Sequence, residues 1–264
     1  MTGIIIIGDE ILSGRREDKH LVKAIELLNE RGMRLSWARY VGDEPDQITA
    51  ELRAAIEGGD VVFSFGGIGA TPDDHTRVCA AAAWGRPLAL HPEAQALILA
   101  RSKVMADKEG LPFLPDHPDT LRRLDMGRFP EGATLIPNPY NQIPGFSIEN
   151  RVHFVPGFPV MAWPMMAWTL DHLHTDLHGL DRQVEHSVIV FTLAESVLTP
   201  LMVELEQTFP GVRVFSLPSV DHPVHGRHIE LGVKGEGALA QHAFTWMQQQ
   251  LSQIGASVGP TMVR

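Results

Sequence analysis

A buried strand runs through three glycines into a helix between residues 61 and 76, where the sequence reads VVFSFGGIGATPDDHT. The apolar run over residues 61–65 is typical of a parallel strand that is covered on both faces. Glycines directly after such a strand let backbone N–H groups approach an anion, and the following helix adds its positive N-terminal end. A glycine pair of this kind is often only a tight turn, so the next residues decide between a connection and a phosphate site.

Two adjacent acids, Asp73 and Asp74, follow the glycines. Capping of the next helix explains one of them, with Thr71 or Asp73 as the N-cap and Thr76 in the first turn. Capping does not explain both. Acids beside a phosphate site usually hold a divalent cation that offsets their repulsion of the anion, so the turn predicts a phosphate site with a metal ion.

Acidic loops also follow two other predicted strands. The isoleucines of residues 4–7 end at Gly8-Asp9-Glu10, and the strand that ends near Val41 is followed by Asp43. Because ligands of open parallel sheets bind outside the carboxyl ends of the strands, the three acidic loops are expected to converge on one crevice. Three basic residues near the first loop either balance phosphate charge or form a solvated helix face: Arg15, Arg16 and Lys19.

A series of motifs follows in order along roughly the first two-thirds of the chain. The motifs are GDEILSGR at 8–15, VGD at 41–43 with Ile48, GGIGATPDDHT at 66–76, Pro137-Asn138, PGF at 144–146 and VPGFP at 155–159. Together they resemble the MoaB/Mog-like molybdopterin-binding domain, most closely its CinA-type branch of competence/damage-inducible proteins. Residues 194–196, Ala-Glu-Ser, resemble the small segment that follows this domain in CinA-type proteins.

The resemblance implies a three-layer α/β domain that binds molybdopterin or a related pyrophosphate-bearing nucleotide. Relatives in the CinA-type branch include metal-dependent hydrolases of ADP-ribose, FAD or coenzyme A. A full CinA continues near residue 264 into a nicotinamide-nucleotide deamidase domain. The resemblance therefore implies a stand-alone form that lacks this second activity.

The chain departs from the family pattern at several positions. His20 stands where many relatives have Asn, Ala70 replaces a frequent Pro, and Asn141 replaces a Gly. Val160-Met161 stands where CinA proteins usually have a Ser-Glu-Met-like run. The missing Glu bears directly on the chemistry of the site.

Composition excludes several classes of function. A net charge of -10, from 22 Lys+Arg against 32 Asp+Glu, argues against nucleic-acid binding, which needs a basic surface. The single cysteine, Cys79, excludes an internal disulfide. The N-terminus has no basic leader pattern and no apolar run approaches about 18 residues. We expect a cytoplasmic protein without a membrane partner.

The chain divides into two predicted domains. Residues 1–175 are expected to form a doubly wound, mostly parallel α/β domain, and residues 176–264 a smaller α+β domain behind a polar hinge over 175–185 that allows closure over the site. The Trp- and Met-rich helix over 161–173 is typical of a core or a subunit interface, and we expect a homo-oligomer, either a dimer or a trimer.

The sequence thus predicts a small phosphate-bearing ligand with a divalent metal, Mg, Mn, Co or Ni, and molybdopterin as a possible ligand. The predicted chemistry is metal-assisted cleavage of a phosphoanhydride. The alternatives are a step of molybdenum-cofactor biosynthesis, either molybdopterin adenylylation or metal insertion, and a catalytically silent binding module. The candidate catalytic residues are Asp9, Asp73 and Asp74; the candidate metal ligands are Asp9, Asp43 and Asp74. The candidate ligand-binding residues are Gly8, Glu10, Ser13, Gly14, Gly66, Gly67, Gly69, Thr71, Thr76, Asn138 and Gly157.

Overall fold

The computed structural model describes residues 1–180 and 183–264. Contacts divide the chain into two units, Met1–Gly179 and Leu180–Arg264, so the division lies after Gly179 rather than after residue 175. Residues 181–182, which belong to the predicted polar hinge, lie outside the described residues.

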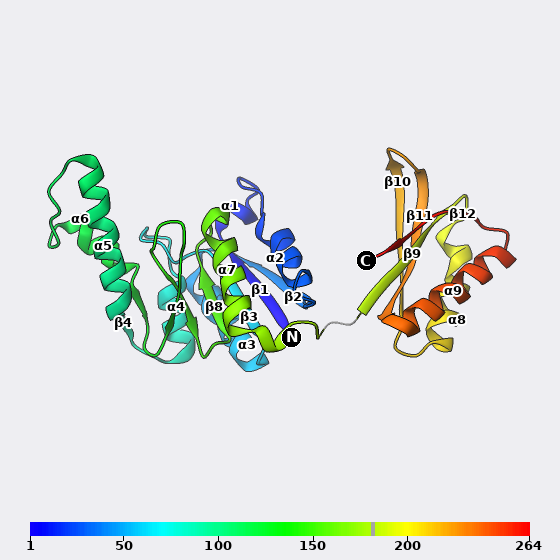
Figure 1. Cartoon of the computed structure of the whole chain (residues 1–264), viewed down its shortest axis with the longest axis horizontal. Coiled ribbons are helices and arrows are strands. Elements are labelled where there is room, and N and C mark those ends of the chain that lie inside the picture. Colours follow the sequence, from blue (N-terminus) through cyan, green and yellow to red (C-terminus); the bar gives the residue numbers. More distant parts are fainter. Residues whose placement is uncertain (181–182) are drawn as a thin grey trace. The chain divides into compact units, whose positions relative to one another are not determined.

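The first unit is built on a six-stranded sheet with the order β2-β1-β3-β8-β7-β6 (Figure 1). The four strands from β2 to β8 are parallel, and β7 and β6 join them as an antiparallel edge. The predicted doubly wound, mostly parallel α/β fold is confirmed. The strand bounds are β1 Thr2–Ile7, β2 Trp37–Val41, β3 Val61–Phe65, β6 Thr134–Ile136, β7 Gly145–Ile148 and β8 Val152–Val155.

Helices cover both faces of this sheet and so complete three layers. The four isoleucines of β1 show why: Ile5 and Ile7 belong to one buried core, and Ile4 and Ile6 to another. The first core includes residues of α3 and α4, and the second includes residues of α2 and α7. The helix bounds are α1 Asp9–Leu12, α2 His20–Asn29, α3 Pro45–Gly58, α4 Thr76–Trp84 and α7 Pro159–Leu173, which a short 3-10 turn follows at Thr175–Leu177.

A small two-stranded sheet and two more helices extend the first unit. Strands β4 (Leu88–Leu90) and β5 (Arg128–Pro130) pair antiparallel, and α5 (Pro92–Glu109) and α6 (Pro118–Asp125) connect them (Figure 1). This excursion returns the chain to the sheet through Met126, which reaches the cavity described below.

The second unit is a smaller α+β domain with an antiparallel sheet of order β10-β11-β9-β12, as the α+β prediction requires. Its apolar core lies between this sheet and helices α8 and α9. The bounds are β9 Gln183–Phe191, α8 Glu195–Thr208, β10 Arg213–His222, β11 Gly226–Glu236, α9 Gly237–Gln253 and β12 Ser257–Val263.

Strand β12 did not follow from the sequence, because Gly259 and Pro260 interrupt it. A proline cannot donate a ladder hydrogen bond and is tolerated at an edge strand or a bulge. Both conditions hold here, since β12 is the edge of its sheet and its pairing with β9 shifts register between Val258 and Thr261. Within residues 1–180 and 183–264, none of the helices combines the length and apolar character needed to cross a bilayer.

Candidate functional site

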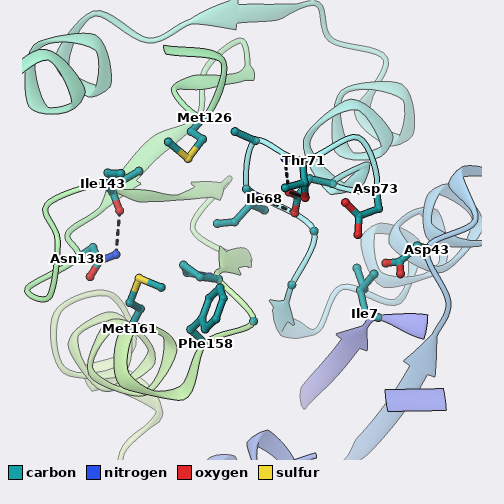
Figure 2. A pocket seen from close by; sticks show the side chains of 18 of the residues that line it. Ile7, Asp43, Ile68, Thr71, Asp73, Met126, Asn138, Ile143, Phe158 and Met161 are labelled. Atoms are coloured by element: carbon teal, nitrogen blue, oxygen red, sulfur yellow. Dashed lines mark hydrogen bonds between the residues drawn. The ribbon is translucent and has the colours of Figure 1, made fainter. Parts of the chain in front are cut away.

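A cavity of about 420 Å³ lies where β1, β3 and β8 of the first unit end (Figure 2). The loops that follow these three parallel strands line it, as expected for an open parallel sheet. The predicted residues that line it are Gly8, Glu10, Asp43, Gly66, Gly67, Gly69, Thr71, Asp73, Asp74, Asn138 and Gly157.

The glycine turn after β3 has a backbone conformation that favours glycine. Gly66 has φ 102° and Gly67 has φ 69°, in the region that L side chains rarely adopt. A Cβ on Gly66 would lie 2.4 Å from the carbonyl oxygen of Ile7, and one on Gly67 would lie 2.1 Å from Oγ1 of Thr76. The turn therefore lies tightly against the backbone of Ile7 at Gly66 and against the side chain of Thr76 at Gly67.

Thr76 lies behind the turn. Its side chain is fully buried, and its hydroxyl donates to the carbonyl of Gly66 at 3.0 Å while its N–H donates to the carbonyl of Gly67 at 3.0 Å. Thr76 is not among the residues that line the cavity, so in this structure it fixes the turn instead of facing a ligand.

The carboxylate of Asp74 accepts hydrogen bonds from the loop residues that precede it. Its Oδ1 accepts the N–H of Gly69 at 2.9 Å, and its Oδ2 accepts the N–H of Thr71 at 2.8 Å and the hydroxyl of Thr71 at 2.5 Å. Within residues 1–180 and 183–264, the N–H groups of Gly67, Ile68 and Ala70 have no hydrogen-bond partner. These three residues line the cavity, so the loop offers it unpaired backbone donors, which bind anions.

Arg77 braces the same loop from inside the protein, and sequence reasoning missed it. Its side chain is buried, and Nη1 donates to the carbonyl oxygens of Ile68 and Gly69. Burial lowers the pKa of this guanidinium. The sequence does not distinguish a buried arginine with this role from a solvent-exposed arginine in the first turn of a helix.

Replacing Arg77 should therefore weaken the first unit. We expect Arg77→Met to lower its free energy of unfolding by about 2–4 kcal/mol, because a buried carbonyl at Ile68 and a partly buried one at Gly69 lose their donor. Urea unfolding followed by fluorescence measures the change. Arg53→Met, which removes an exposed arginine from α3, is the matched control and should change little. Equal stability of the two variants would contradict this bracing role.

A group of acids lies on one side of the cavity. The N–H of Asp9 donates to Oδ2 of Asp43 at 2.9 Å, and the N–H of Asp43 donates to Oδ1 of Asp9 at 3.2 Å. Partial burial raises the pKa of Asp43, and the negative charges of Asp9, Glu10 and Asp73 raise it further. The structure therefore concentrates negative charge next to the glycine turn, where a cation would relieve the repulsion.

The opposite side of the cavity is apolar. Met126, Ile143 and Met161 lie across from Asp43 and Asp73 in Figure 2. Sequence reasoning missed these three side chains because they come from distant loops and helices and show no common motif. Together the two sides can hold a ligand with an apolar ring at one end and anionic groups at the other.

Asn138 organises the loop on the apolar side. Its amide nitrogen donates to Oδ1 of Asn141 at 2.8 Å and to the carbonyl of Ile143 at 3.0 Å, and its oxygen accepts the N–H of Tyr140 at 3.0 Å. Asn138 lines the cavity but is nearly fully buried. Its main contribution is therefore to hold this loop in place.

His20 holds the loop after β8. The carbonyl of Gly157 can only accept, so Nε2 of His20 carries the hydrogen of their 3.0 Å bond. The His20 ring stacks on Phe65, and burial lowers the pKa of this histidine. His20, one of the departures from the family pattern, thus makes a buried contact to the cavity wall.

The remaining predicted residues lie away from the cavity lining. Ser13 and Gly14 are exposed in the turn after α1, and Asp9 reaches the site only through its two hydrogen bonds with Asp43. Within residues 1–180 and 183–264, no group of three or more His, Cys, Asp or Glu side chains is arranged to hold a metal ion.

The fold and the cavity define an α/β domain with a cavity where its parallel strands end. The chain belongs to the family described as a probable molybdopterin binding domain, which matches residues 3–175. The resemblance to MoaB/Mog-like domains and their CinA-type branch is thereby confirmed.

Individual relatives agree with this family. The chain is 31% identical over 242 residues to a CinA-like protein of Geobacter metallireducens, covering 90% of this chain and 56% of the relative. It is 30% identical over 259 residues to a protein of Caldivirga maquilingensis, covering 95% of this chain and 94% of that one. This chain thus spans little more than half the length of the CinA-like relative.

A solved structure also resembles part of this chain. The crystal structure of the protein CinA, with unknown function, from Thermoplasma acidophilum is 28% identical, with a TM-score of 0.53. The match covers 67% of this chain and 96% of that chain.

Proposed function

We propose that the first unit binds a pyrophosphate-bearing pterin or nucleotide and cleaves its phosphoanhydride with a divalent metal ion. The observation that carries this proposal is the set of unpaired N–H groups at Gly67, Ile68 and Ala70, directly beside an acidic group. Such donors bind phosphate oxygens and stabilise the charge that develops on them during cleavage. The match to a molybdopterin-binding family supports a ligand of this chemical class.

The acidic side chains on the cavity wall suit a hard divalent ion whose other ligands are oxygen atoms of the bound phosphates. Mg²⁺ is usually bound by one or two carboxylates together with substrate phosphates and water, rather than by a cage of protein groups. Asp43 and Asp73 line the cavity and can serve in this way. Asp74 uses both oxygens within the loop, so we assign the metal to Asp43 and Asp73 and give Asp74 a positioning role. When bound, such an ion polarises a phosphoryl oxygen and lowers the pKa of an attacking water.

The chain's own groups then have distinct tasks. The glycine turn binds the phosphates, the apolar side with Met126, Ile143 and Met161 holds the ring end, and Asp43 and Asp73 carry the charge that attracts the cation. Hydrolysis adds one water across the anhydride, and each half leaves with a terminal phosphate. This division of tasks relies on positioning and electrostatics.

A second candidate is a binding module without turnover. Met161, which lines the cavity, falls in the segment where the family resemblance implies a glutamate. A cavity that keeps its phosphate donors but lacks this acid would still bind its ligand. A step in molybdenum-cofactor assembly, with the molybdopterin phosphate as nucleophile in place of water, would use the same loops.

A panel of ligands separates these functions. ADP-ribose, FAD, coenzyme A and molybdopterin, the last both alone and with ATP, should be incubated with the protein, each with and without Mg²⁺, Mn²⁺, Co²⁺ and Ni²⁺. We expect metal-dependent release of monophosphate products from at least one of them. Tight binding without products would favour the binding module, and products formed only from molybdopterin with ATP would favour the biosynthetic step.

Asp43→Asn should reduce metal-dependent turnover by about a hundredfold or more, because it removes a charge from the cation site with little change in volume. Higher metal concentration should restore part of the activity. Asp46→Asn, an exposed acid at the start of α3, is the matched control. Full activity of Asp43→Asn at low metal concentration would contradict the assignment.

A further inference from the structure

The side chains that line the cavity at the glycine turn carry an unbalanced charge. Four of them are acids, Glu10, Asp43, Asp73 and Asp74. Among residues 1–180 and 183–264, Arg16 is the only lysine or arginine that lines this cavity. The divalent ion proposed above at Asp43 and Asp73 offsets part of the negative charge, and an incoming pyrophosphate adds more. Arg16 is therefore placed to supply positive charge that the ion alone does not.

The backbone of Arg16 is held in place, whereas its guanidinium is held only weakly. The N–H of Arg16 donates to the carbonyl of Glu10 at 2.9 Å, which fixes the residue beside α1. Its Nη1 lies 3.8 Å from Oε1 of Glu10, and both side chains are open to solvent. The guanidinium also lies 5.9 Å from the centre of the exposed Phe158 ring. Exposed contacts of these two kinds contribute little stability, so the guanidinium can change partners at low cost.

Glu10, the present partner of Arg16, is close to the proposed metal site. A Cβ added to Gly8 would lie 2.6 Å from Oε2 of Glu10, so this carboxylate lies against the backbone where β1 ends. Burial, and after it a set of negative charges that includes Glu10, raises the pKa of Asp43. Arg16 thus neutralises an acid that acts electrostatically on the cation site.

The two other basic residues of this loop do not share the position of Arg16. Arg15 and Lys19 are exposed and are not among the residues that line the cavity. Nε of Arg15 donates instead to Oγ of Ser13 at 3.1 Å. The sequence does not separate the three basic residues, because they lie within five positions of one loop. The cavity lining separates them.

We propose that Arg16 clamps a phosphate of the ligand, and that its guanidinium turns away from the Glu10 carboxylate to do so. A guanidinium can bind two phosphate oxygens at once through parallel N–H donors, which a single carboxylate contact at 3.8 Å does not match. The clamp lies beside the glycine turn, so backbone donors and Arg16 hold the same pyrophosphate. This proposal rests on the proposed function, because a phosphate at the glycine turn is the partner that draws Arg16 away from Glu10.

Arg16→Gln tests the clamp because it removes the charge and keeps most of the side-chain length. Calorimetry measures the affinity for inorganic pyrophosphate, with Ca²⁺ in place of a catalytic ion. We expect the affinity of Arg16→Gln to fall by about tenfold or more. Arg16→Lys should recover only part of this loss, since an ammonium keeps the charge but lacks the two parallel donors. Arg15→Gln is the matched control and should bind as wild type does.

Chemical protection locates the contact directly. Phenylglyoxal modifies arginine side chains, and peptide mass spectrometry reports Arg15 and Arg16 separately. We expect pyrophosphate with Ca²⁺ to protect Arg16 and to leave the exposed Arg15 reactive. Wild-type affinity in Arg16→Gln, or no protection of Arg16, would overturn the clamp and leave the proposed function standing. Failure of wild type to bind pyrophosphate would overturn both.

Discussion

Gly67→Val should abolish binding of pyrophosphate-bearing ligands while most of the first unit stays folded. A Cβ at this position would lie 2.1 Å from Oγ1 of the buried Thr76, and the backbone φ of 69° is unfavourable for a branched residue. The turn must shift, and strain of this type costs about 1–3 kcal/mol. Because the N–H groups that face the cavity move with the turn, we expect affinity for pyrophosphate to fall by about a hundredfold or more.

Gly59→Val is the control for this experiment. Gly59, at the end of α3, has a similar φ of 71°, but nothing lies within 4 Å of an added Cβ. It therefore carries the same backbone penalty without the clash and without a place in the cavity. Calorimetry with inorganic pyrophosphate and thermal unfolding of both variants separate loss of binding from loss of stability. Pyrophosphate affinity equal to wild type in Gly67→Val would reduce the glycine turn to a connection.

Acid should unfold the first unit through three buried histidines. Burial lowers the pKa of His20 and of His174, and lowers that of His153 well below its ordinary value. The Nε2 atoms of His153 and His174 are 2.7 Å apart, a hydrogen bond in which one ring supplies the N–H and the other the lone pair. Protonating either ring inserts a charge into the core.

The sign of the pH dependence follows from proton uptake. Below about pH 6.5 the unfolded chain binds more protons at these histidines than the folded chain does, so stability falls as pH falls. Three such groups lower the free energy of unfolding by up to about 4 kcal/mol per pH unit. Domains are stable by only about 5–15 kcal/mol, so the first unit should unfold under mild acid.

Urea unfolding at a series of pH values measures this dependence. Trp37, Trp84, Trp163 and Trp168 belong to the first unit and only Trp246 to the second, so tryptophan fluorescence follows mainly the first. The double variant His153→Leu with His174→Leu should lose about two-thirds of the slope between pH 6 and 5. A slope unchanged by this double substitution would show that other groups cause the acid unfolding.

The sequence by itself determined the architecture of the first unit and the place of its site. The run of four isoleucines over residues 4–7, the acidic loops at strand ends and the glycine turn are short-range patterns, and each depends on residues close in the chain. Parallel strands bring such loops together at one edge, so Gly67, Asp43 and Asp73 were placed in one crevice from sequence alone.

Only the tertiary structure decided what each polar group does there. Asp74 and Thr76 bond to the backbone of the turn, Arg77 braces it from the core, and His20 reaches Gly157 across 137 positions of the chain. The apolar wall is likewise formed by segments far apart in sequence. Hydrogen-bond partners and cavity linings depend on distances between such segments, and local sequence patterns do not specify those distances.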